Sequence, residues 1–219
     1  MKARQILLLA ATFCATTSVD AAGIGVRAGT TGVGVDFGWT LAPTLSARIG
    51  YSGLGYKTTI EESDISYDTK LTLSNLSAFL DWSPLGPFRI TAGIVGNGNK
   101  ADLTGTPTGG TFTINGVPYN AADVGTLSGS VEPGRSAAPY LGIGYGNVAG
   151  AGVNFYFDLG VIFQGAPTAS LSASCGPALP PAQCTQIRND LAAEQQQLQE
   201  QLDKYKVFPV LSLGVTVGF

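Results

Sequence analysis

The chain has 219 residues, and only 12% of them are charged, compared with about a quarter in an ordinary soluble domain. The formal net charge is −3 and the basic residues are scattered, which excludes the basic surface that nucleic acid requires. After the signal-like N-terminus, no apolar run approaches the roughly 20 residues of a membrane-spanning helix. The hydrophobic residues must therefore be spread over short segments.

The N-terminus has the pattern of a secretory signal peptide. A basic start precedes the apolar stretch Ile6–Phe13, and the small residues Ala21 and Ala22 follow at the position of a cleavage site. We therefore predict a signal peptide over residues 1–22 and an exported mature chain from about Gly23.

The first half of the mature chain contains four segments in which large apolar residues alternate with polar or small ones. This period of two is typical of β-strands. The segments are 23–29, 33–41, 45–52 and 76–82. Between Leu71 and Leu76 the alternation slips by one residue, which predicts either a β-bulge or a strand that leaves the membrane.

The same alternation predicts four more strands in the second half, over 88–94, 139–145, 153–163 and 211–219. Ile162 is the main residue out of phase. The total of eight is the even number that a closed antiparallel barrel needs.

The faces of these strands distinguish a membrane barrel from a soluble β-sandwich, which would also alternate. Six charged residues lie on the face opposite the large apolar side chains, together with Gly, Ser, Thr and Asn; they are Arg27, Asp36, Arg48, Asp81, Arg89 and Asp158. The apolar face is rich in aromatic residues near the strand ends, as in membrane barrels. The predicted fold is all-β: an eight-stranded antiparallel transmembrane β-barrel with long extracellular loops and one amphipathic loop helix.

The connections support this fold because short turns alternate with long polar segments. The turns are 42–44, 83–87 and 146–152, and the predicted extracellular loops are about 57–70, 97–136 and 166–206. Outer-membrane barrels have this asymmetry, with the long loops outside the cell.

Two of the long segments contain further predicted structure. We expect a hairpin around Phe112, Ile114 and Tyr119, and a helix over about 186–205 with a narrow apolar stripe. The helix either binds a partner near the barrel mouth or, as we favour, packs on neighbouring loop residues.

The only cysteines of the predicted mature chain are Cys175 and Cys184. In an oxidising compartment this pair predicts a disulfide that staples a loop. Two cysteines without any histidine argue against a metal site, and we expect no cofactor.

The final segment Leu211–Phe219, with Phe219 as its last residue, resembles the C-terminal signature that the β-barrel assembly machinery recognises. The mature chain as a whole resembles the small outer-membrane barrels of the OmpA, OmpX and OmpW kind. This resemblance implies a monomer in contact with outer-membrane lipid and lipopolysaccharide. The long loops and the helix before the last strand depart from a minimal barrel of that kind.

The absence of histidine removes the general base that outer-membrane hydrolases generally use, so we predict that the protein is not an enzyme. The six inward charges favour a plug that fills the lumen over a pore lining. We therefore predict a structural or surface-interaction role, with a possible surface ligand held by the loops. The alternative is a narrow channel for small or hydrophobic solutes.

Overall fold

The computed structural model describes residues 21–62, 65–107, 110–120, 124–176 and 179–219. Nearly all of the predicted signal peptide lies outside these residues. Ala22, the last residue assigned to it, is the first residue of strand β1.

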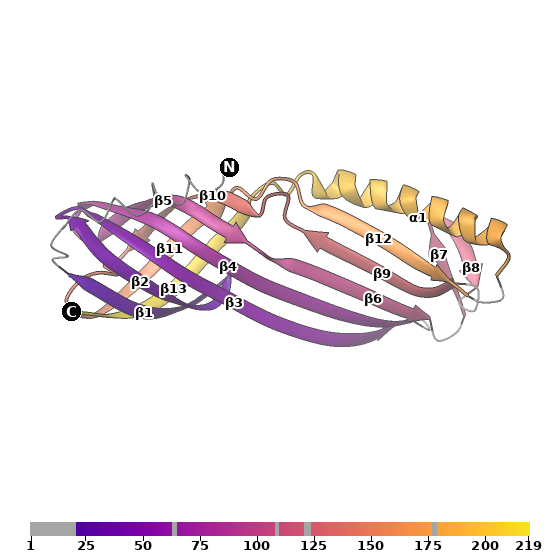
Figure 1. Cartoon of the computed structure of the whole chain (residues 1–219), viewed down its shortest axis with the longest axis horizontal. Helices are drawn as coiled ribbons and strands as arrows, with labels where there is room; N and C mark the ends of the chain where they lie inside the picture. Colours follow the sequence, from indigo (N-terminus) through magenta and orange to yellow (C-terminus); the bar gives the residue numbers. More distant parts are fainter. Residues whose placement is uncertain (1–20, 63–64, 108–109, 121–123, 177–178) are drawn as a thin grey trace, which may run out of the picture.

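A ring of eight antiparallel strands forms one end of the molecule (Figure 1). These strands are β1 (Ala22–Gly29), β2 (Gly32–Ala42), β3 (Leu45–Glu62), β4 (Ile65–Leu85), β5 (Phe88–Asn97), β10 (Ala137–Tyr145), β11 (Gly152–Ile162) and β13 (Phe208–Gly218). The neighbours follow this order, and the pairing of β1 with β13 closes the ring. The predicted eight-stranded barrel is confirmed, and the soluble sandwich is wrong.

The outer face of the ring carries a continuous belt of exposed apolar side chains. Each strand contributes, for example through Val26, Val35, Ile49, Leu80, Ile94, Leu141, Phe155 and Leu213. Such a belt would be an aggregation surface in water, whereas a bilayer covers it. The ring is therefore the membrane-spanning part of the chain.

Beyond the ring, β3 and β4 continue as a long hairpin and begin a second structure, which we call the extension. Strands β6 (Lys100–Pro107), β9 (Val124–Glu132) and β12 (Thr168–Cys175) add to β4 in that order. Helix α1 (Pro181–Leu202) lies beside β12, and the small hairpin of β7 (Thr111–Ile114) and β8 (Val117–Asn120) lies at the far end (Figure 1).

The segments expected to be loops are therefore largely regular structure. Residues 57–62 and 65–70 form the paired upper parts of β3 and β4, 97–136 contains β6 to β9, and 166–206 contains β12 and α1. The expected hairpin around Ile114 is present as β7–β8. Helix α1 begins five residues before the expected start at 186, because proline is accepted in the first helical turn. It ends three residues before 205.

The phase slip near Leu71 comes from a change of surroundings. The register of β3 against β4 is unbroken from Leu45 opposite Trp82 to Glu62 opposite Ile65, so a bulge is not the cause. Leu71 and Leu73 lie on the same face as the inward-facing strand residues of the ring. That face is mainly polar in the ring and becomes apolar in the extension. The slip therefore marks the point where the strand leaves the membrane, as one of the two expectations held.

Candidate functional site

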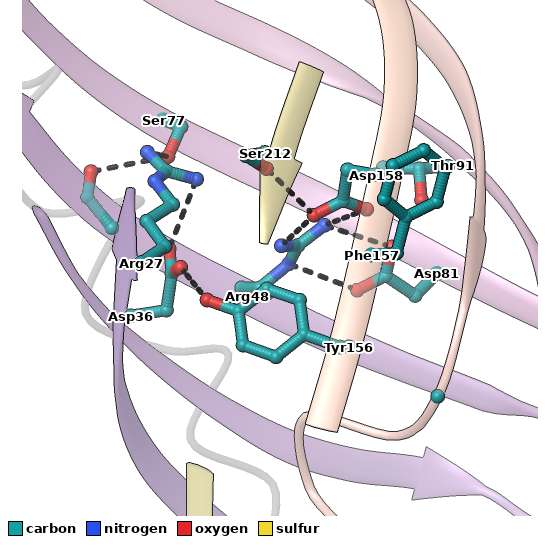
Figure 2. Close-up of polar contacts among 12 residues, drawn as sticks. Arg27, Asp36, Arg48, Ser77, Asp81, Thr91, Tyr156, Phe157, Asp158 and Ser212 are labelled. Carbon is teal, nitrogen blue, oxygen red and sulfur yellow. Dashed lines mark hydrogen bonds and ion pairs between the residues drawn. The ribbon is translucent and has the colours of Figure 1, made fainter. Parts of the chain in front are cut away.

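A cluster of four buried charges crosses the middle of the barrel lumen. Figure 2 labels Arg48, Asp81 and Asp158 among them. Arg48 on β3 forms ion pairs with Asp81 at 3.1 Å and with Asp158 at 2.8 Å. Arg89 on β5 lies 2.5 Å from Asp158 and 3.4 Å from Asp81, and Thr91 donates a hydrogen bond to Asp81. The two arginines and two carboxylates thus connect β3, β4, β5 and β11 across the ring.

The remaining two charges form a separate pair. Arg27 on β1 lies 3.2 Å from Asp36 on β2, and the Tyr156 hydroxyl donates a hydrogen bond of 2.5 Å to Asp36. Arg27 also donates to the hydroxyls of Ser52 and Ser77. The six charged residues predicted to face the lumen all do so, but they form two groups instead of one.

Aromatic rings fill the space between these groups. The guanidinium of Arg48 lies 5.1 Å from the centre of the Phe79 ring and 5.6 Å from that of Tyr156, within the range of a cation–π interaction. A β-carbon on Gly214 would overlap the Tyr156 ring. In the alternating segment 153–163, Tyr156 is in phase with Asp158 and so faces inward, and Gly214 opposite it makes room for its ring.

A second, apolar layer closes the lumen at the end toward the extension. Its buried members are Phe79, Val95, Ala138, Tyr140, Ile162 and Val210. Ile162, which was out of phase in the sequence, is 1% exposed there. Its apolar side chain faces inward because this layer, unlike the rest of the lumen, is apolar.

The opposite end of the lumen is closed by the turn between β10 and β11. Val148 and Ala149 in this turn are buried, and Val148 lies against the small residues Gly23 and Gly38. Between the charged and apolar layers there remains a cavity of about 20 Å³, enough for about one water molecule. Side chains of the charged layer, the apolar layer and this turn therefore fill successive levels of the lumen.

The extension contains a much larger concavity, which we call the groove. It has a volume of about 610 Å³ and lies between the inner face of the extension sheet, the β7–β8 hairpin and helix α1. Its apolar lining is Tyr67, Leu103, Ile114, Leu127, Leu171 and Leu191. The groove was not predicted from the sequence because its lining comes from six separate segments.

Helix α1 and the β7–β8 hairpin form one wall of the groove. Ile187 of the helix packs with Ile114 and Val124, and the Tyr119 hydroxyl donates a hydrogen bond to the Asp190 carboxylate. This bond raises the pKa of Tyr119 to about 12 and lowers the pKa of Asp190. The helix therefore packs on neighbouring residues of the extension, as favoured from its narrow apolar stripe.

The disulfide between Cys175 and Cys184 joins the end of β12 to the first turns of α1. The bond holds the start of α1 next to the end of β12. Phe219 lies directly after β13 with an exposed side chain, and its backbone exchanges hydrogen bonds with Ala22. Its role as an assembly signal stays a prediction.

No helix in the described part of the chain has the length and apolar character to cross a bilayer. Among these residues, no three His, Cys, Asp or Glu side chains are grouped so that they could hold a metal ion.

No protein-family model matches the sequence, and no curated protein matches it either. Solved structures similar in fold include two from one organism. CarO2 of Acinetobacter baumannii is 21% identical with a TM-score of 0.60, and the match covers 91% of this chain and 98% of CarO2. CarO of the same organism is 24% identical with a TM-score of 0.59, covering 90% and 97% respectively. Together with the closed eight-stranded ring, this similarity shows that the chain has the fold of the small outer-membrane β-barrel proteins.

Proposed function

We propose that this protein is a non-enzymatic barrel of the bacterial outer membrane that acts at the cell surface through its extension. The observation that carries the proposal is the contrast between a filled lumen and an open groove. The lumen is blocked by the charged layer, the apolar layer and the turn at Val148. The groove, by contrast, offers an accessible apolar surface of the size that small-molecule and peptide sites have.

The orientation of the molecule supports a surface role. The C-terminus and the short turns lie at the end of the ring away from the extension (Figure 1). In outer-membrane barrels the short turns face the periplasm and the long connections face the outside. The extension would then project into the extracellular medium.

Two further features support a non-enzymatic role. The chain contains no histidine, and the buried carboxylates of the lumen are paired with arginines in a space that substrate does not reach. The groove has only one acidic side chain among its lining residues, Glu194, and Glu194 accepts a hydrogen bond from the backbone of Asn115.

Planar-bilayer recording of the purified protein tests the closed lumen. We expect no stable unitary conductance from protein whose folded state is verified by heat-modifiable migration on gels. Reproducible single-channel steps would instead support the narrow channel and would overturn the closed-lumen part of the proposal.

Cysteine labelling on intact cells tests the orientation. We expect Thr59→Cys, on the outer face of the extension, to react with a membrane-impermeant maleimide. Thr44→Cys, in the turn between β2 and β3, serves as the matched control and should react only after the cells are lysed. The native pair Cys175 and Cys184 is bonded and gives no background. The reverse labelling pattern would contradict a surface role for the extension.

A further inference from the structure

The sheet of the extension has two edges, and one of them is covered. At β12 the glutamine-rich helix α1 satisfies the backbone of the edge strand (Figure 1). The side-chain oxygens of Gln199 and Gln195 accept hydrogen bonds from the N–H groups of Ala169 at 3.0 Å and Leu171 at 2.9 Å. Gln199 also donates to the carbonyl of Pro167. Such cover is a common way to stop a sheet edge from pairing with another chain.

The other edge, at β3, has no such cover among the described residues. Strand β2 pairs with β3 only as far as Gly53, and the segment Leu54–Glu62 pairs only with β4. This free edge is longer than an average whole strand of five to six residues.

The direction of the free backbone groups follows from the ladder. The Ser83 N–H donates to the Thr44 carbonyl, and these residues continue the β3–β4 register. Because hydrogen-bonded and non-hydrogen-bonded pairs alternate, even-numbered β3 residues bond to β4 and odd-numbered ones point toward the free edge. Gly55, Lys57 and Thr59 thus present unpaired N–H and C=O groups to an incoming strand.

The inner face next to this edge is apolar and exposed. Leu54, Tyr56 and Ile60 are 48%, 59% and 52% exposed, because α1 contacts β12 and β7 on the opposite side of the groove. A strand added at the β3 edge would place every second side chain beside these residues on the inner face.

The outer face next to this edge carries two lysines in directly opposite positions, together with Asp68 and Asp102. Lys57 lies directly opposite Lys70 on β4, and neither forms an ion pair with another described residue. Like charges in directly opposite positions destabilise a sheet. An acidic side chain on an added strand would lie beside Lys57 on this face and relieve the repulsion.

We propose that the β3 edge from Leu54 to Glu62 binds an extended peptide segment of a partner protein by strand addition. The segment alternates apolar side chains, which face the groove, with polar ones, of which the residue opposite Lys57 is acidic. This inference rests on the surface role proposed above. A second copy fits less well, because two copies in one membrane direct β3 the same way and would pair in parallel, whereas all strand pairs described in this chain are antiparallel.

The test uses the full-length protein in detergent micelles and a fluorescently labelled synthetic peptide of about eight residues. The peptide alternates valine with threonine and carries one central aspartate. We expect saturable binding by fluorescence anisotropy, and we expect it to slow hydrogen exchange of the amides of Gly55, Lys57 and Thr59.

Two variants examine the geometry of the edge. Thr59→Pro removes an N–H that points to the free edge and leaves the β4 ladder intact, so it should weaken binding at least tenfold. Lys57→Glu should also weaken binding at least tenfold, and a peptide with lysine in place of the aspartate should recover the loss. Lys204→Glu makes the same charge change at an exposed position just after α1 and should leave the affinity unchanged.

Absence of binding to the wild-type protein would overturn the inference, and so would equal binding by wild type and Thr59→Pro. Either result leaves the closed lumen and the labelling pattern untouched, so the proposed function would stand without this partner. Single-channel conductance combined with normal peptide binding would overturn the closed lumen and leave the β3 edge as a peptide site.

Discussion

The barrel and the extension are built partly from the same two strands, yet their faces have opposite polarity. In the ring, β3 and β4 direct apolar side chains such as Ile49 and Leu80 outward and charged ones such as Arg48 inward. In the extension the outer face carries Lys57 and Lys70, and the inner face carries apolar residues. An alternating sequence therefore shows that a strand is present, while the surrounding medium decides which face is apolar.

The two regions also differ in what stabilises their interiors. The barrel interior depends on buried ion pairs that hold six strands together around Arg48, Asp158 and Asp36. The extension depends on a small apolar cluster around Ile187, on helix α1 and on a disulfide. Disturbing each region separately should reveal this difference.

Removal of one buried charge in the barrel should have the largest effect. Arg48→Met leaves Asp81 and Asp158 with one arginine between them in a dry lumen, and loss of one partner of a buried ion pair costs about 3–5 kcal/mol. Guanidinium unfolding in micelles, followed by gel mobility, measures the loss. The control is Lys57→Met in the extension, whose free energy of unfolding should lie within about 0.5 kcal/mol of the wild-type value. A similar loss in both variants would show that the buried lumen charges contribute no more to stability than an exposed lysine.

A charge placed on the outer face should distinguish lipid from water. Val26 lies on β1 between Val35 and Val215 on the neighbouring strands, so Val26→Arg places a cation in the apolar belt and should cost about 2–4 kcal/mol. The same substitution on the outer face of the extension, Thr59→Arg, should change the free energy of unfolding little. Equal effects in lipid vesicles would contradict the assignment of the membrane to the ring.

Loss of the disulfide should weaken the extension alone. The bond closes a loop with a sequence separation of 9, for which loop entropy predicts a loss of about 2–3 kcal/mol. The double variant Cys175→Ser/Cys184→Ser should show faster proteolysis near α1 and unchanged heat-modifiable migration of the barrel. A barrel that loses its compact gel form would show that the two regions unfold as one.

The smallest effect should be a pH dependence confined to the extension. The raised pKa of Tyr119, about 12 instead of 10.0, stabilises the fold below pH 10, and this contribution is lost as the pH rises toward 12. The lowered pKa of Asp190 stabilises the fold above its ordinary value of 3.8, and this contribution is lost as the pH falls below that value.

Tyr119→Phe removes the first contribution and the largest part of the second, because it removes the shared hydrogen bond, while Gln186 still donates to Asp190. Thermal melts of the helical circular dichroism signal should show the largest difference between wild type and variant at neutral pH and a smaller difference at both extremes. Parallel curves at all pH values would mean that the hydrogen bond does not couple to folding.

The barrel strands could be predicted because lipid outside and polar groups inside give a strong alternation. The strands of the extension could not, because small residues such as Ala101 and Gly129 on the inner face and Ser128 on the outer face weaken the contrast. Their partners are also distant in sequence, as in the pairing of β6 with β9.

The lumen charges could be predicted as a set, since all six lie on one face of their strands. Their pairing could not, because it depends on the registers around the closed ring. Arg48 reaches Asp158, which lies 110 positions away in the sequence, only after β11 has joined the barrel. The β3 edge and the groove required the three-dimensional arrangement for the same reason.

Because the register of β3 against β4 is unbroken, the length of these two strands sets the height of the groove above the membrane surface. Each residue of an antiparallel strand adds about 3.4 Å, so two residues inserted into both strands near Gly53 would raise the groove by about 7 Å with its faces preserved. A single residue inserted into each strand would turn the lysine face inward and the apolar face toward water. Related chains that differ in the reach of this hairpin should therefore differ by even numbers of residues in each strand.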